Sequence, residues 1–595
     1  MRHAPHPPQK TTRIETSTLA WLALLALAIG TYIFGLDGQY ILSNGDELVY
    51  THIARLTAAS NNWLPLVSEL DHMRNTKPPL LFWQAMVAGD WGRHWTQAAL
   101  RTPSLIYTFS IAGAVAWTVQ KMTHNLRSAC LAACVYLAFF CTFRYGRTYL
   151  TSAPESFWFN VPLFWLLWQR LRETPTTATQ HLGWLAHVSF GLAFGLGLAY
   201  KSFALIAPAA ATLWCAQLLS LPAINGRALV QTTLKVSLSA LIALGVFALW
   251  FALDPDPAAV WQEFVVGENA GKLSSGKGYW YNAMWGGSYS IWAHLLGYVE
   301  NAGLLAFIVL GLAWVGLRAW RQRNAATPLP VHLVILLVWL AVWLAVFSLP
   351  SQRSARYVIP AMPALAVLIT LYWERIARAW FLPSLLLCAV FIGALGRIAW
   401  AAHDIGIGTT TELVTTLLVV ALDFALVIGG FFKPAWTRAC TLATCFVFYA
   451  CFSLTTAPLE GADGQYNAQT KAQLHAARIA VPSNFNGQFE RFQFLLPGHQ
   501  FVPYNDQGPL EQAASNKELS RLLATHDAVI WFPSSLAELT PPCAPDCKVL
   551  GTRWEVRGRH KNGEITLANL WYPQTWLFRR EWLLANASPA IAAPR

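Results

Sequence analysis

The chain has 595 residues, of which 55% are hydrophobic and only 12% are charged, whereas about 25% of the residues in an ordinary soluble domain are charged. This composition excludes one large soluble protein, a disordered chain and a coiled coil. A formal net charge of +12 would suggest a nucleic-acid partner in a soluble protein, but in a membrane protein basic residues collect in cytoplasmic loops, and no nucleic-acid-binding motif is present.

Apolar runs recur along most of the first 456 residues, and runs of roughly 18 or more such residues indicate membrane spans. The first run follows Arg2, Lys10 and Arg13 without a signal-peptide cleavage site behind it, so we expect a retained first span and a cytoplasmic N-terminus. Thirteen spans are predicted, at about 19–36, 101–119, 131–143, 157–168, 182–200, 203–221, 236–253, 302–316, 331–349, 358–372, 382–400, 413–431 and 440–452.

This topology places basic residues in every cytoplasmic loop, as the positive-inside rule requires. It leaves two long loops outside, 37–95 and 254–300, and an odd number of spans also puts the tail outside. We therefore expect a transmembrane domain over 1–456 and a soluble periplasmic α/β domain over 457–595. In that tail, short apolar runs predict strands at 479–482, 492–497, 528–532 and 549–556, and helical spacing predicts a helix over 510–524.

Eight of the ten cysteines lie within or beside the predicted spans, where buried thiols are common. The other two, Cys543 and Cys547, lie in the tail, in Pro-Pro-Cys-Ala-Pro-Asp-Cys. A disulfide between them is favoured over free thiols in an extracytoplasmic domain. A zinc site would need further ligands, and His526 and His560 are not at ligand spacing.

The first charged group at an outer span end is Asp46-Glu47, which follows Gly45 and begins a short amphipathic helix. Adjacent carboxylates whose pKa is tuned by partial burial can act as a general base. The alternative is a solvated loop in which Asp46 caps the helix.

Lys77 lies in Asn-Thr-Lys-Pro-Pro, directly before an apolar and aromatic stretch. The two prolines fix the chain there, and they hold the ammonium at the height at which a lipid phosphate lies. A lysine that only anchors the chain at the membrane surface is the alternative.

Glu155 lies at the outer start of the fourth span, and Lys201 lies in a minimal turn between the fifth and sixth spans. A carboxylate at this depth is costly, so we expect it to be paired or functional. Arg144 and Arg147 are close enough in sequence to neutralise it.

Two further outer groups carry cations: Glu268, Asn269 and Lys272 in the loop 254–300, and Arg353 and Arg356 before the tenth span. The planar guanidinium group of arginine suits phosphate oxygens. All of these groups face the same side of the membrane. Together they indicate a site that binds an anionic lipid and moves protons.

The order of these motifs resembles that of bacterial lipid-linked sugar transferases, specifically the aminoarabinose transferase and protein O-mannosyltransferase group of the GT-C superfamily. The resemblance covers roughly residues 15–375. It is carried by Asp46-Glu47 with Tyr50, Trp63-Leu64-Pro65, Lys77-Pro78-Pro79-Leu80, Arg101-Thr102-Pro103-Ser104, Pro154-Glu155, Gly197-Leu198-Ala199-Tyr200-Lys201 and Arg356-Tyr357-Val358-Ile359-Pro360.

Members of this group take a sugar from a polyprenyl phosphate at the outer face of the inner membrane and pass it to lipid A, a glycan or a protein. The resemblance implies a polytopic α-helical GT-C fold and a catalytic base at Asp46, with Glu47 beside it and Glu155 as a second acid. It implies donor-phosphate contacts from Lys77, Lys201, Lys272, Arg353, Arg356 and Tyr357. Glu155 stands where the group usually has aspartate, and Lys272 replaces an arginine.

Direct displacement at such a donor would invert the anomeric centre, and only one base is required because a lipid phosphate is a good leaving group. A divalent metal ion that bridges Asp46, Glu155 and the phosphate is also compatible with these residues, although no ligand set selects one metal. Three alternatives stay open: a polytopic transporter or flippase, an enzyme like the O-antigen ligases, and a family member that has lost its chemistry.

Overall fold

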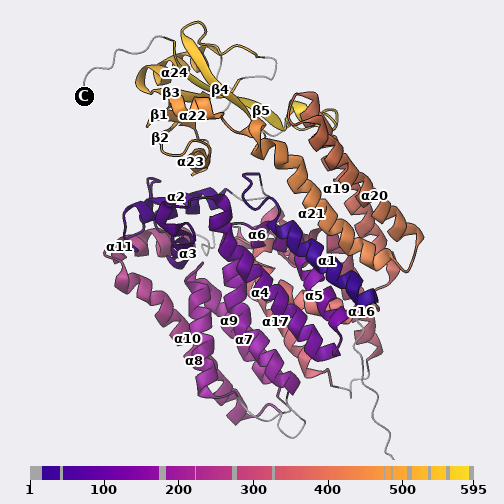
Figure 1. Ribbon diagram of the computed structural model, residues 1–595. Helices are drawn as coiled ribbons and strands as arrows, with labels where there is room; N and C mark the ends of the chain where they lie inside the picture. The colour runs from indigo at the N-terminus through magenta and orange to yellow at the C-terminus, as the bar shows by residue number, and fades with distance from the viewer. Residues whose placement is uncertain are drawn as a thin grey trace, which may run out of the picture.

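The computed structural model describes residues 16–40, 45–172, 182–221, 223–270, 278–323, 328–474, 476–483, 487–504, 512–533, 538–557, 560 and 563–587. It is a bundle of long helices with a small sheet domain at one end (Figure 1). The short helices α2 (Asp46–Ala59) and α3 (Leu80–Ala88) lie at that same end, between the bundle and the sheet domain (Figure 1).

Thirteen helical segments of the bundle coincide with the thirteen predicted spans. They are α1 (Thr16–Ile33), α4 (Gln97–Thr123), α5 (Leu126–Ala138) with α6 (Phe140–Gly146), α7 (Ser152–Arg172), α8 (Trp184–Leu198), α9 (Ile206–Leu219), α10 (Gly226–Leu253), α15 (Gly297–Ala302) with α16 (Ala306–Gln322), α17 (Val331–Phe347), α18 (Met362–Leu371), α19 (Phe381–Asp404), α20 (Thr410–Phe432) and α21 (Thr437–Glu460).

Within the described residues, five helices are long and apolar enough to cross a membrane by themselves, and the bent pair α5 and α6 could form a sixth span. Five further apolar helices are shorter, between 10 and 17 residues. α4 and α7 are long but carry many polar residues, which they bury against the bundle. A helix surrounded by protein need not be apolar on every side, so the number of thirteen spans stays a prediction.

The described parts of the two loops predicted to lie outside contain short helical segments. Over 254–300 these are α11 (Pro257–Val260), the π-helix η3 (Trp261–Ala270), α13 (Tyr279–Trp285) and α14 (Ile291–Leu295). A 3-10 helix, η6 (Ala355–Ala361), precedes α18. These segments lie around the end of the bundle at which α2 and α3 are found.

The sheet domain contains five strands in the order β2-β1-β3-β5-β4. β1 (Arg478–Pro482) pairs in parallel with β2 (Gln500–Tyr504) and with β3 (Ala528–Trp531), whereas β5 (Phe578–Asn586) pairs antiparallel with β3 and β4 (Cys547–Val556). Side chains alternate across such a sheet. Ala480, Val529 and Trp582 accordingly pack with α24 (Gln512–Thr525) on one face, and Ile479, Ile530 and Leu583 pack with α23 (Arg491–Leu495) on the other.

The sheet domain corrects one prediction and leaves two strands that the sequence analysis missed. The run 492–497 is not a strand, because Phe492, Leu495 and Leu496 bury their side chains at the spacing of a helix, in and just after α23. β2 and β5 were not predicted, although the helix over 510–524 corresponds to α24. Cys543 and Cys547 form a disulfide, which closes the loop before β4.

A buried ion pair joins the sheet domain to α2. Glu490 is fully buried; it accepts hydrogen bonds from Arg55 Nε (2.5 Å) and Nη2 (2.9 Å), and its Oε2 lies 2.9 Å from His52 Nδ1. The backbone N–H of Glu69 in turn donates to His52 Nε2. Through these contacts the sheet domain fixes the position of α2, the helix that begins at Asp46.

Candidate active site

The two adjacent carboxylates at the start of α2 have different surroundings. Glu47 is buried; it accepts hydrogen bonds from Arg101 Nε (2.7 Å), Arg101 Nη2 (3.1 Å) and the backbone N–H of Tyr149 (2.9 Å). The side chain of Asp46 is 38% exposed, and its Oδ2 lies 3.6 Å from Arg356 Nη1. Glu47 therefore joins α2 to α4, while Asp46 is accessible.

Lys77 lies on a loop that is hydrogen-bonded to the π-helix η3. Its Nζ donates to Glu268 Oε1 (2.7 Å) and to the carbonyl of Thr76. Next to it, Asn75 donates through its backbone N–H and its side-chain amide to Glu263. These bonds fix the position of the lysine, and its Nζ lies 5.9 Å from the centre of the Tyr50 ring.

Glu155 pairs with Lys201, not with the arginines that are nearer in sequence. Lys201 Nζ lies 2.8 Å from Glu155 Oε1, and both groups are largely buried. Glu155 Oε2 is buried and has no hydrogen-bond partner among the described residues. The turn that carries the lysine is held by Ser202, whose hydroxyl donates to Asn269 of η3.

Burial lowers the pKa of the Lys201 ammonium. The Glu155 carboxylate acts in the opposite direction, and the positive charges of Arg356 and Lys77 lower the pKa further. The contacts agree with this: the hydroxyl of Ser202, next to Lys201, donates to Asn269, and the neighbouring Glu268 accepts from Lys77.

Tyr50, on α2, lies among these charges. Burial raises the pKa of its phenol, and the charges of four side chains act on that pKa: Asp46, Arg356, Glu268 and Glu155. The structure therefore gathers six groups that are distant in sequence, here called the charged cluster: Asp46, Lys77, Glu155, Lys201, Glu268 and Arg356.

The aromatic residue after Arg356 also belongs to this neighbourhood. The Tyr357 ring stacks on Phe347 (4.8 Å between centres), and Lys201 Nζ lies 5.9 Å from its centre. Arg356 itself lies over the ring of Tyr145, 4.9 Å from its centre.

Two predicted phosphate contacts are not placed in this cluster. Arg353 is buried and donates to the carbonyls of Ser348 (2.8 Å) and Tyr289 (3.1 Å) and to the hydroxyl of Tyr279 (3.1 Å), so it fixes the segment around α13 and α14. Lys272 lies outside the described residues.

Sequence reasoning missed the acidic partners Glu263 and Glu490. Glu490 was detectable as a carboxylate among Phe489, Phe492 and Phe494, which is an unusual setting for an exposed charge. No signal in the sequence predicted the contact of Glu263 with Asn75, because their separation of 188 positions is bridged only by the fold.

The residues do not fit the metal bridge considered from the sequence. In the part of the chain that the structure describes, no three His, Cys, Asp or Glu side chains form a group that could hold a metal ion. Asp46 and Glu155 each face a cationic side chain. We therefore derive no step through a metal.

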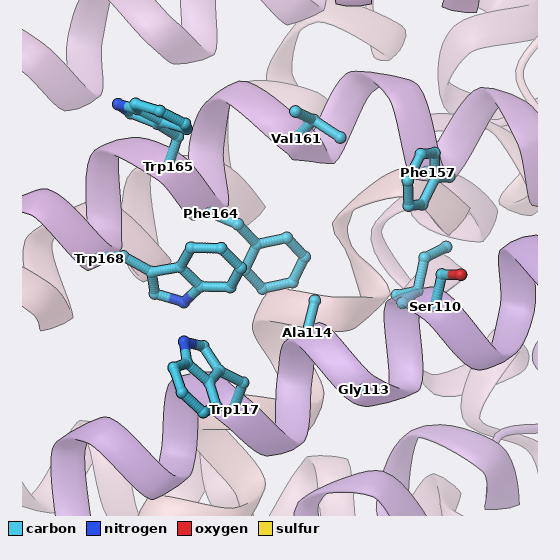
Figure 2. Close-up of a pocket in the computed structure, with 10 residues that line it drawn as sticks. Ser110, Gly113, Ala114, Trp117, Phe157, Val161, Phe164, Trp165 and Trp168 are labelled. Atoms are coloured by element: carbon cyan, nitrogen blue, oxygen red, sulfur yellow. The ribbon is translucent and has the colours of Figure 1, made fainter.

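An apolar groove of about 510 Å³ lies between α4 and α7, and none of the six residues of the charged cluster lines it. Figure 2 shows Trp117 of α4 and Phe164 and Trp168 of α7 pointing toward one another across it. No residue that lines it carries a charge, so the groove suits apolar contacts such as those with hydrocarbon chains.

A second cavity, of about 600 Å³, lies between α2, the bundle helices α4, α19 and α21, and the sheet domain. Its apolar wall comes from α19 and α21, through residues such as Leu395 and Phe452, and its polar wall includes Gln97 and Arg491. Gln97 Oε1 and Arg491 Nε have no hydrogen-bond partner among the described residues. The cavity is therefore amphipathic.

No family model matches the chain. Over 555 residues it is 26% identical to undecaprenyl phosphate-alpha-4-amino-4-deoxy-L-arabinose arabinosyl transferase 1 of Sodalis glossinidius, a match that covers 87% of this chain and 91% of the relative. The corresponding transferase of Serratia proteamaculans is 25% identical over 367 residues, 60% of each chain.

Among solved structures, ArnT from Cupriavidus metallidurans bound to undecaprenyl phosphate superposes with a TM-score of 0.59 at 16% identity, over 96% of this chain and 99% of that one. Its apo state gives 0.57, over 98% and 100%. These likenesses confirm the resemblance that the motifs indicate. They identify the chain as a membrane-embedded glycosyltransferase with an ArnT-like GT-C fold, related to the aminoarabinose transferases.

Proposed function

We propose that this protein transfers a sugar of the aminoarabinose type from an undecaprenyl-phosphate-linked donor to an acceptor at the periplasmic face of the bacterial inner membrane. The observation that carries this proposal is the charged cluster, in which three carboxylates and three cations from distant parts of the chain meet at one end of the bundle. The names of the relatives support the choice of donor.

The donor phosphate would lie among Lys77, Lys201 and Arg356, with Tyr357 beside it. Positive groups held in a partly buried site stabilise a departing phosphate more strongly than they would in water. Each of these cations is paired with a carboxylate, so the phosphate competes with those partners when it binds.

Asp46 is the base in this proposal. Its side chain is the most exposed carboxylate of the charged cluster. When Arg356 turns to the phosphate, Asp46 loses that ion pair, and its carboxylate accepts the proton of an acceptor hydroxyl. The acceptor oxygen then forms a bond to the anomeric carbon as the bond from that carbon to the phosphate oxygen breaks, and the configuration inverts.

Glu155 is the second acidic residue, and its Oε2 has no partner among the described residues. A buried carboxylate oxygen left without a donor is costly. A sugar hydroxyl or an ammonium group on the bound donor would supply that donor, while Lys201 keeps the other oxygen in place.

The acceptor in this proposal is a lipid such as lipid A, rather than a protein. The amphipathic cavity behind α2 supports this choice, since its apolar wall suits acyl chains and its polar wall suits a sugar headgroup. Gly45 and Glu47, the neighbours of Asp46 in the chain, line this cavity, while Asp46 itself does not; an acceptor bound there would have to reach past the start of α2 to the proposed base.

The test is transfer of a radiolabelled sugar from a polyprenyl-phosphate donor by purified protein. Asp46→Asn and Lys77→Ala should each abolish most of the activity. Asp71→Asn is the matched control, because Asp71 is an exposed carboxylate of the same outer loop that lies outside the charged cluster. Equal activity in all four proteins would overturn the proposal.

Other functions of polytopic proteins predict different results. A transporter keeps its ionisable groups near the middle of the membrane, whereas the charged cluster lies at helix ends, and a transporter would move the donor without forming a product. An enzyme like the O-antigen ligases would consume a whole glycan instead of one sugar, so the mass of the product distinguishes the two enzymes.

A further inference from the structure

The exposed apolar surface of the sheet domain is concentrated in one segment. Between residues 461 and 587, seven large apolar side chains of the described residues are exposed, and five of them lie within eight positions: Ile565, Leu567, Leu570, Trp571 and Tyr572. Leu567 is 94% exposed and Trp571 65%. Contiguous patches of this kind mark interaction surfaces.

This segment, residues 563–577, is ordered by its own hydrogen bonds. Asn569 exchanges hydrogen bonds with Thr566, and its side-chain amide donates to the carbonyl of Glu564. Trp576 Nε1 donates to the carbonyl of Asn569 (3.0 Å). The apolar side chains therefore project from a fixed loop, and the segment does not fold them inward.

The last residues of the segment pack against the end of α19, and this contact fixes the position of the segment along the bundle. Its 3-10 turn η10 (Pro573–Thr575) contacts α19, and Leu577 and Phe578 pack with Ala402 and Ile407 at the end of that helix. Figure 1 shows this yellow part of the chain against the upper end of α19.

The apolar outer surface of the bundle reaches the same height. Trp400 of α19 is 51% exposed only four residues before the helix ends at Asp404, and Val414 of α20 is 48% exposed near the start of that helix. Tryptophan on a lipid-facing surface marks the boundary between hydrocarbon and water. The segment 563–577 thus projects at the level of that boundary.

Charge does not oppose insertion there. Glu564 is the single charged side chain of the segment, and it is paired with Arg557. An aromatic and aliphatic surface with its one charge neutralised suits the region of the lipid headgroups and upper acyl chains.

We propose that residues 563–577 insert into the outer leaflet of the membrane beside α19 and tether the sheet domain to the bilayer. The partner is the lipid surface itself. Because Glu490 joins the sheet domain to α2, the tether also limits how α2 can tilt over the membrane. The inference requires the outward orientation of the sheet domain but not the proposed sugar transfer.

The test places an environment-sensitive fluorophore on single cysteines in protein reconstituted into nanodiscs of phospholipid. Leu567→Cys and Leu570→Cys carry it in the segment, and Ser520→Cys carries it on an exposed position of α24, which Figure 1 places at the upper edge of the sheet domain. The eight native free cysteines are buried or half-buried, and protein without an added cysteine gives their background labelling.

We expect a shift to shorter wavelength and quenching by nitroxide-labelled lipid at positions 567 and 570, and neither effect at 520. Water-like emission without quenching at all three positions would overturn the tether and would indicate a protein partner for this surface. Quenching at all three positions would also overturn it, because contact would not be specific to the segment. A protein inactive in sugar transfer can still pass this test, so the two proposals fail separately.

Discussion

Replacing each of the two adjacent carboxylates at the start of α2 by its amide should have different effects: loss of stability at Glu47 and loss of activity at Asp46. Glu47→Gln replaces a carboxylate that accepts three hydrogen bonds, two from Arg101 and one from the backbone of Tyr149. The amide keeps the volume but removes the charge and presents an N–H₂ group to the arginine. We expect this variant to lose stability.

The magnitude follows from how much of the pair is buried. The side chains of Arg101 and Glu47 are 2% and 8% exposed, and breaking a buried pair by changing one partner costs about 3–5 kcal/mol. Arg101 keeps the carbonyls of Leu36 (2.8 Å) and Gly38 (2.6 Å) as acceptors. The cost should therefore lie near the lower end, at about 3 kcal/mol.

The assay is thermal unfolding of purified protein in detergent, with Asp46→Asn as the matched control. For a cooperative unit of about 400 residues, 3 kcal/mol lowers the unfolding temperature by about 3 °C. Asp46→Asn changes an accessible side chain, so its unfolding temperature should match that of the wild type while its transfer activity is lost. The reasoning is wrong if Glu47→Gln unfolds like the wild type or if Asp46→Asn is the less stable variant.

Two further changes test the electrostatics and the domain contact. Burial lowers the pKa of Lys201 below the ordinary 10.5, so the ammonium loses its charge at a lower pH than a free lysine. Lys201→Arg keeps its charge and should extend donor binding to higher pH, measured as the pH profile of KM. If KM rises at the same alkaline pH in the wild type and in this variant, the reasoning is wrong. Glu490→Gln leaves His52 and Arg55 without their carboxylate and should cost about 3 kcal/mol in thermal unfolding. Glu518→Gln, which changes a half-buried carboxylate paired with Arg521 on α24, should cost at most about 1 kcal/mol. Equal losses in the two variants would refute the buried ion pair as the contact between the sheet domain and α2.

Much of the bundle could be predicted from the sequence because lipid requires long apolar helices, and each predicted span coincides with a helix. The sheet domain was harder to predict. Its strand β5 has a buried Glu581 and carries Arg579 and Arg580 directly after its first residue, Phe578, so charged residues in ion pairs mask the alternation expected of a strand. The run 492–497 is apolar enough for either state, and only its contacts with the sheet decide for a helix.

The candidate site was predicted as a set of residue types on one side of the membrane, and the structure supplies the pairing. Proximity in sequence suggested Arg144 and Arg147 for Glu155, yet the fold places Lys201 there, 46 positions away. Arg353 and Arg356 looked equivalent in the sequence, but their surroundings differ. Arg353 is buried and bonds to backbone carbonyls, whereas Arg356 faces Asp46. Long-range packing decides such differences, and composition does not record it.

The internal pairing of the charged cluster bears on turnover. In the proposed reaction the lipid product is a phosphate monoester, whose negative charge is larger than that of the diester substrate and would hold it to the three cations. Glu268, Glu155 and Asp46 stand next to those cations and compete for them again once the sugar has gone. When these ion pairs form again, they favour dissociation of the carrier lipid phosphate, and the site is then open to the next donor.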